Sequence, residues 1–167
     1  MLPPSLLNNL PTQPSDTEVL ISRMLDAPRD LVFRTWTEAA HIARWWLPPG
    51  FANTACEIDL RVGGRMYIGM RSPDGVDYPC EALFEEITPS ERLVFQGLGS
   101  DTHPCGSGVP PGSRVTVNFV EQGQQTRLTI RASFSTPQLC AAARDHGFEP
   151  SWQGALHGFA AYLQHLA

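Results

Sequence analysis

The chain has 167 residues, of which 42% are hydrophobic and 17% are charged, as expected for one globular domain with a real core. Its formal charge is −5 and all 12 basic residues are arginine, which argues against nucleic-acid binding and excludes Schiff-base or P-loop lysine chemistry. No stretch is apolar enough to span a membrane, and the opening MLPPSLLNNLPTQPSD lacks the features of a signal peptide, so a cytoplasmic location is expected.

The first expected strand covers residues 17–25, where Val19, Ile21 and Leu25 share one parity. Pro28 suits the first turn of a short helix that ends near Trp36. Thr37 is expected to cap a second helix over 38–44. Residues 1–16 are rich in proline and polar side chains and are expected to form a flexible arm, with the domain over 17–167.

A run of alternating segments follows, separated by short turns containing glycine or proline. The expected strands cover 56–60, 66–70, 78–87, 92–98, 115–119 and 128–134. Short turns force neighbouring strands to be antiparallel, so the chain is predicted to form a sheet of about seven strands.

The C-terminal part is helical in pattern. A short helix is expected from Pro137 to Asp145, with Gly147 ending it, and a longer one from Pro150 to the C-terminus. The longer helix carries an apolar stripe at helical spacing, made of Trp152, Leu156, Phe159, Leu163 and Leu166. An open sheet with one apolar face must be covered, and this helix is the only large element available to do so. The predicted fold class is therefore α+β, a helix-grip fold with a curved antiparallel sheet, two short helices and a long C-terminal helix over the concave face.

Several short motifs, in this order, resemble those of a known family. They are Ala27-Pro28 with Val32-Phe33 and Trp36-Thr37, Arg44-Trp45-Trp46, Pro49-Gly50-Phe51, Asp59-Leu60-Arg61 with Gly63-Gly64-Arg65, Pro73-Asp74-Gly75, Glu91-Arg92-Leu93, Thr126-Arg127-Leu128-Thr129 and the Trp152 helix. The chain resembles the START-like superfamily shared with the birch-pollen allergens. Within it, the motifs are similar to the SRPBCC family named after the activator of the heat-shock-protein ATPase. The resemblance covers about Glu18 to Leu166.

The resemblance implies a helix-grip fold and a cavity rather than a particular reaction, because fold does not fix function. Many family members are bacterial proteins of unassigned role. The chain departs from the family pattern at Trp45-Trp46-Leu47-Pro48, where Trp-Trp-Gly-Pro is usual, and its loop over 99–112 is longer. Both departures lie where a cavity mouth is expected, so they bear on the identity of any ligand.

The candidate cavity residues are large apolar side chains, together with one glycine of the last helix. They are Trp45, Trp46, Met66, Ile68, Met70, Phe84, Phe95, Trp152, Leu156, Gly158 and Phe159. Only one of the adjacent Trp45 and Trp46 is expected to face a ligand, because neighbouring side chains on a helix diverge. Gly154 and Gly158 lie four residues apart, which indicates that side-chain volume is unwanted on their face of the helix. A solvent-facing position for both is the alternative.

Catalytic and metal sites are weakly supported. Asp101, His103 and Cys105 lie close in sequence, but a glycine-rich loop gives them no fixed geometry. Glu57 and Asp59 share a strand face with arginines nearby, which favours a solvated salt-bridged surface over a catalytic pair. The four cysteines, Cys56, Cys80, Cys105 and Cys140, are too far apart for a structural zinc site, and buried thiols are expected although two disulfides stay open. No cofactor or metal is expected.

Three hypotheses for function follow. The first is a carrier or sensor that binds a small lipophilic molecule in an internal cavity. The second is an enzyme of cyclase, hydrolase or dehydratase type that uses the same cavity, and the third is a stress or chaperone accessory that acts through its surface. The inward-facing parities carry Cys, Ile, Leu, Met and Phe and no acid or base, which favours binding over catalysis. A homodimer is compatible with the sequence.

Overall fold

The fold was analysed in a computed structural model, which describes residues 16–47, 50–98, 113–145 and 147–166. The strands are β1 (Glu18–Leu25), β2 (Ala52–Ile58), β3 (Arg65–Arg71), β4 (Asp77–Thr88), β5 (Arg92–Gly97), β6 (Arg114–Gln122) and β7 (Gln125–Ser133). The helices are α2 (Arg29–Thr37), α3 (Ala39–Trp45), α4 (Pro137–Asp145) and α5 (Phe148–Leu166). Apart from Asp16, the expected N-terminal arm lies outside the described residues.

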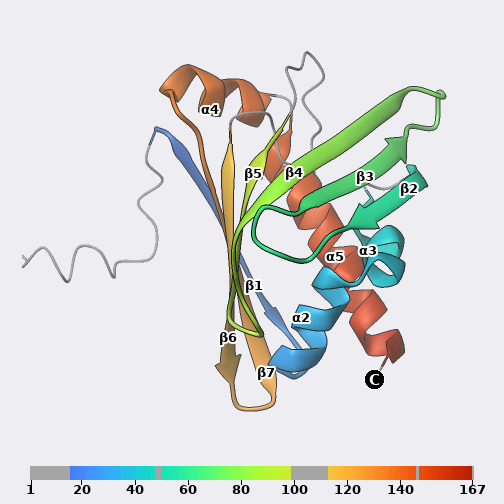
Figure 1. Ribbon diagram of the computed structural model, residues 1–167, viewed down its shortest axis with the longest axis vertical. Coiled ribbons are helices and arrows are strands. Elements are labelled where there is room, and N and C mark those ends of the chain that lie inside the picture. Colours follow the sequence, from blue (N-terminus) through green and yellow to red (C-terminus); the bar gives the residue numbers. More distant parts are fainter. Residues whose placement is uncertain (1–15, 48–49, 99–112, 146, 167) are drawn as a thin grey trace, which may run out of the picture.

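The strands form one seven-stranded antiparallel sheet in the order β1-β7-β6-β5-β4-β3-β2. Only β1 joins out of sequence order. It pairs with β7, so that Ile21 lies opposite Ile130. The other six strands are consecutive neighbours joined by turns or loops. The predicted α+β helix-grip architecture is confirmed (Figure 1).

Three local predictions were wrong. Leu60 was expected on the inner face of a strand, but β2 ends at Ile58 and Leu60 is 43% exposed, because the chain turns there and the Arg61 amide donates to the Asp59 carbonyl. Thr37 does not cap α3, since its hydroxyl donates back to the Phe33 carbonyl at 2.9 Å within α2. The last helix begins at Phe148 rather than Pro150, one residue after Gly147.

The inner face of the sheet is apolar and carries α5. The helix buries Trp152, Leu156, Phe159 and Leu163 as predicted, while Leu166, the last residue of the predicted stripe, is 37% exposed. The backbone of α5 approaches β1 more closely than any other strand, and it also packs beside α3 and α4. In Figure 1, α5 crosses the sheet on the same side as α2 and α3. The central strands therefore meet the helix mainly through their side chains.

The outer face of the sheet is charged and held by cross-strand ion pairs. Arg65 lies 2.9 Å from Glu81, and Arg114 lies 3.0 Å from Glu85. The predicted salt-bridged surface near β2 is confirmed for Asp59, which binds Arg61 at 2.7 Å. Exposed pairs of this kind add little stability, about 0–1 kcal/mol each. They identify this face as a solvated one, so the apolar interior lies on the other side.

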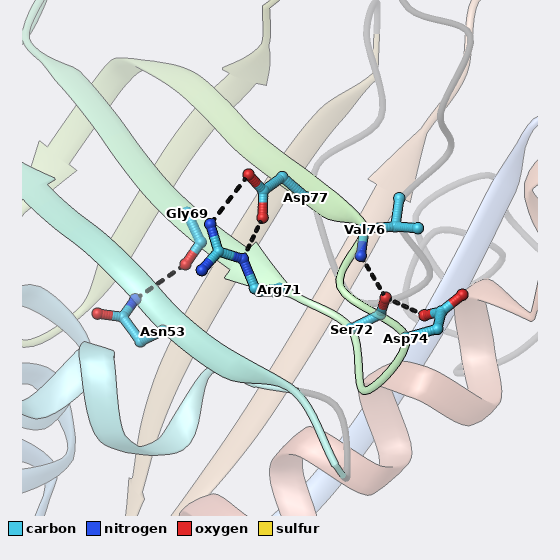
Figure 2. Close-up of polar contacts among 7 residues, drawn as sticks. All are labelled: Asn53, Gly69, Arg71, Ser72, Asp74, Val76 and Asp77. Atoms are coloured by element: carbon cyan, nitrogen blue, oxygen red, sulfur yellow. Dashed lines mark hydrogen bonds and ion pairs between the residues drawn. The ribbon is translucent and has the colours of Figure 1, made fainter.

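The turn between β3 and β4 is fixed by polar contacts, shown in Figure 2. The Ser72 hydroxyl accepts a hydrogen bond from the Val76 amide and donates to Asp74. At the first residue pair of the hairpin, Arg71 donates to Asp77 at 2.7 Å, and this hydrogen bond lowers the pKa of the Asp77 carboxyl. The polar contacts that close this hairpin therefore lie at its exposed turn, and the side chains on the inner face of both strands are apolar.

Gly158 lies on the outer side of α5, contrary to the expectation that it borders interior space. The residue is exposed, and a Cβ built there meets no atom within 4 Å. Gly158 is about 100° around the helix from the buried Phe159, so the stripe that faces the sheet excludes it. The solvent-facing alternative is the correct one for this residue.

We expect Gly158→Ala to raise the free energy of unfolding by about 0.5–1 kcal/mol, because alanine is the better helix former and its methyl group meets open space. Gly64→Ala is the matched comparison. A Cβ there collides with the Asp59 carbonyl oxygen and lies 2.9 Å from that of Arg61, so a loss of more than about 1 kcal/mol is expected. Urea unfolding of both variants measures the two values, and a destabilised Gly158→Ala would show that the outer face of α5 is packed.

Candidate functional site

A cluster of aromatic rings fills the space between the helices and the inner face of the sheet. Trp36 of α2 is at its centre and contacts rings from three other segments of the chain. Its neighbours are Trp45 and Trp46 at the end of α3, Phe119 of β6, and Trp152 and Phe159 of α5. Trp36 and Trp152 are stacked, with ring centroids 5.9 Å apart and planes inclined by 5°. This aromatic cluster joins the helical layer to the sheet.

Sequence analysis did not place Trp36 among the cavity residues. The signal was present, because Val32, Phe33 and Trp36 have the spacing of one helical face, and all three are buried. What the sequence could not show is that this face of α2 meets α5, which lies more than one hundred residues later. Trp36 is nevertheless the ring with the most aromatic neighbours in the cluster.

Trp45 and Trp46 are both buried. Trp46 is the C-terminal cap of α3 and keeps αR backbone angles, with its amide donating to the Ile42 carbonyl. Which of the two rings faces a ligand stays a prediction. The two rings are 5.4 Å apart. The Trp45 indole N–H donates to the Thr35 carbonyl at 2.9 Å. That hydrogen bond fixes the Trp45 ring and leaves its donor satisfied.

Two other indole N–H groups in the cluster are not satisfied. Within the described part of the chain, Trp36 Nε1 and Trp46 Nε1 are buried and have no hydrogen-bond acceptor. The two residues are 1% and 0% exposed, so bulk water does not reach them. A buried donor without an acceptor costs about 1–3 kcal/mol. Two buried donors that lack a hydrogen-bond acceptor therefore lie together in this one cluster.

The strand residues predicted to line a cavity are brought together on the inner face. Met66, Ile68 and Met70 alternate inward along β3, and Phe84 of β4 contacts Phe95 of β5 at 6.1 Å between centroids. All five are at most 2% exposed. Methionine is flexible and adapts to irregular space, which suits either a core or a ligand surface.

Between these large side chains, the inner face carries two small residues side by side. Ala82 of β4 lies opposite Gly97 of β5 in the register, and both are buried. On its other side Ala82 lies opposite Met66 of β3. Side-chain volume on the inner face is therefore low at this one cross-strand pair, and the neighbouring side chain of Met66 is a flexible one.

A polar contact between two side chains links α3 to α5. His41 Nδ1 and the Tyr162 hydroxyl share a hydrogen bond of 2.7 Å, and His41 Nε2 lies 3.3 Å from Glu38. No local pattern indicated this contact, since the two residues are 121 positions apart in the chain. The histidine is part-exposed and its partner is a tyrosine packed against the core, so the contact ties two helices at the border of the aromatic cluster.

The family described as "Activator of Hsp90 ATPase homolog 1-like protein" matches residues 26–164. The chain belongs to this family. The match begins just after β1 and ends two residues before the end of α5, so it covers every other element and all of the aromatic cluster.

Several solved structures share the fold of this chain. A Nitrosomonas europaea protein is 24% identical over 90% of this chain and 96% of that one, with a TM-score of 0.79. A Rhodobacter sphaeroides protein is 18% identical over 93% and 98%, with a TM-score of 0.81. The AHSA1-like protein from Aeromonas hydrophila is 22% identical over 89% and 93%, with a TM-score of 0.66. A comparison with curated proteins finds no match.

Metal-ligating side chains are not clustered in the described part of the chain. Within residues 16–47, 50–98, 113–145 and 147–166, no group of three or more His, Cys, Asp or Glu side chains could hold a metal ion. Asp101, His103 and Cys105 lie outside these ranges, so the loop hypothesis stays a prediction. No helix among the described residues is long and apolar enough to cross a membrane.

Cys56 and Cys140 of the described segments are free thiols. Cys80 and Cys140 are buried, and Cys56 is half-buried beside Ile68 of the neighbouring strand. Desolvation, and to a smaller extent the charge of Glu57, raises the pKa of Cys56 to about 11. A thiol with so high a pKa carries little thiolate at neutral pH, so Cys56 is a packing residue rather than a nucleophile.

We expect iodoacetamide to label Cys56 roughly 100-fold more slowly at pH 8 than a peptide thiol, because a pKa two units higher leaves about one hundredth of the thiolate. Mass spectrometry of a Cys105→Ser variant follows the reaction at this position. The same variant unfolded in urea is the control and should label at the peptide rate. Labelling of the folded protein at that rate would contradict the assigned burial of Cys56.

Proposed function

We propose that this protein binds one small lipophilic molecule between the inner face of its sheet and α5, as a carrier or sensor. The observation that carries the proposal is the low side-chain volume at Ala82 and Gly97 on the inner face. A sheet face whose only task is to pack a helix is expected to carry large side chains in its central strands, because interiors are close-packed. Small residues at this position leave room for an apolar guest.

The surroundings of these two residues fit an apolar guest. Met66 lies beside Ala82 and can change its rotamer to follow different shapes. Phe84 and Phe95, the next inward residues on β4 and β5, supply aromatic surface. Small-molecule sites are usually lined in this way, by apolar side chains with a few placed polar groups. Family membership supports the same role, since the START-like fold is built around an enclosed interior.

The position of α5 also supports the proposal. Its backbone approaches β1 most closely among the strands, so side chains rather than backbone contacts lie between α5 and the middle of the sheet. Side chains can shift to admit a guest at lower cost than a directly packed backbone. In this arrangement the contact between α5 and β1 stays unchanged, and the side chains over β4 and β5 adapt to the guest.

Ala82→Leu tests the proposal by filling the proposed space. We expect the variant to keep a free energy of unfolding close to that of the unchanged protein, because the added atoms occupy the ligand volume. Apolar compounds of one to three rings, screened by thermal shift, should stabilise the unchanged protein by about 2.7 kcal/mol at one hundred times the dissociation constant. The same compounds should not stabilise Ala82→Leu.

Ala132→Leu is the matched control. Ala132 is equally buried on the same face, but it lies between Val19 and Val115 on the neighbouring strands. Leucine there should overpack the contact and cost about 1–3 kcal/mol, while the protein that remains folded binds the ligand as before. If Ala82→Leu loses as much stability as Ala132→Leu, the space at Ala82 is already full and the proposal fails.

A further inference from the structure

The two unsatisfied indole donors call for an acceptor that the described chain does not provide. Trp36 Nε1 and Trp46 Nε1 lie in the same cluster, with ring centroids 5.8 Å apart. Nearly all buried polar groups in folded proteins have a hydrogen-bond partner, and each exception requires an explanation. Trp45, in the same cluster, shows the ordinary outcome, since its indole N–H donates to a backbone carbonyl.

Water is a poor partner at this position. A buried water molecule makes about three hydrogen bonds and therefore needs a site with both donors and acceptors. The rings that pack against Trp36 and Trp46 are those of Trp45, Phe119, Trp152 and Phe159, which offer no oxygen. An oxygen atom attached to an apolar body fits better, because the body replaces the missing polar partners by contact with the rings.

We propose that the lipophilic molecule bound by this protein carries a hydrogen-bond acceptor, such as a ketone oxygen, which accepts from the indole N–H of Trp36 or Trp46 or from both. This inference rests on the proposed binding function and specifies the chemistry of the ligand. The rest of the molecule is apolar and lies against the aromatic cluster and the inner face of the sheet. A pure hydrocarbon would leave both donors unsatisfied.

The competing explanation is a weak hydrogen bond to an aromatic face. Trp46 and Trp152 are close to perpendicular, with ring centroids 4.9 Å apart and planes inclined by 76°. In such an arrangement an indole N–H can point at the neighbouring ring. These contacts are second-order in strength, and an oxygen acceptor would displace them.

The test compares two ligands of one shape, 1-tetralone and tetralin, which differ by a ketone oxygen. A second pair, 2-nonanone and nonane, covers a linear shape. In an apolar site without donors the ketone binds more weakly than the hydrocarbon, because its carbonyl loses its hydrogen bonds to water. With donors present, we expect the ketone to bind at least as tightly as the hydrocarbon, measured by isothermal titration calorimetry.

Trp36→Phe and Trp46→Phe remove one donor each and keep an aromatic ring. We expect the ratio of hydrocarbon to ketone dissociation constants to fall about three- to tenfold in at least one of them, the usual range for one neutral hydrogen bond. Trp45→Phe is the matched control. Its donor is already used by Thr35, so the ratio should stay at the value of the unchanged protein.

The indole NMR signals of the unchanged protein give a measurement that does not depend on whether any variant folds. Addition of 1-tetralone should move the Nε1–H signal of Trp36 or Trp46 downfield, as a new N–H···O bond does, and tetralin should not. The Trp45 signal should not show this downfield shift with either compound. Assignment comes from the three Trp→Phe spectra, or from sequential and ring contacts for a variant that does not fold.

The outcomes separate this inference from the function it rests on. The acceptor inference is overturned, and the binding function stands, if the hydrocarbon-to-ketone ratio of dissociation constants is equal in all four proteins. The same holds if the ketone binds but does not move the Nε1–H signals of Trp36 and Trp46. Failure of both ligand pairs to bind the unchanged protein would overturn the binding function and this inference with it. A ratio that falls in Trp36→Phe or Trp46→Phe and not in Trp45→Phe supports both.

Discussion

The packing of Trp36 against rings from α3, α5 and β6 is the contact on which the rest of the structure depends. A seven-stranded sheet with one apolar face cannot remain open to water, and the helices must be held over it. Trp36 reaches all of them from a short helix that follows the first strand directly. Buried aromatic side chains contribute the largest apolar areas in a core, so a single residue can join four elements.

The same contact underlies the proposed binding of a guest. Its rings fill the space between α2, α3, α5 and β6. The inner face also carries the small residues Ala82 and Gly97. Flat rings packed edge to face also leave few backbone carbonyls nearby, and two indole donors therefore remain without partners. The features that favour a lipophilic ligand thus follow from one way of covering the sheet.

Most of the fold could be predicted from the sequence, because the period-two pattern of β3 and the apolar stripe of α5 are strong local signals. The errors occurred where a local pattern continues past the point at which tertiary contacts end it. Leu60 keeps the strand alternation, but the chain has already turned. Gly158 has the spacing of a packing motif, but the buried stripe lies on the other side of the helix.

The candidate site was predicted less completely. The inward position of Met66, Ile68 and Met70 could be predicted from parity alone, since alternate residues of a strand point to one side. The role of Trp36 and the contact of His41 with Tyr162 depend on how distant segments meet, which one sequence does not encode locally. Whether an indole N–H has an acceptor depends on positions of individual atoms, and no pattern of residue types reveals it.

Intermolecular NOEs between 1-tetralone and the protein test the central claim most directly, because they locate the guest without a variant. The account predicts contacts from the ring protons of the ligand to the methyl groups of Ala82 and Met66, which are buried on the inner face. Contacts restricted to exposed side chains such as Val62 or Leu139 would contradict it, since they would place the compound on the surface and leave the interior closed.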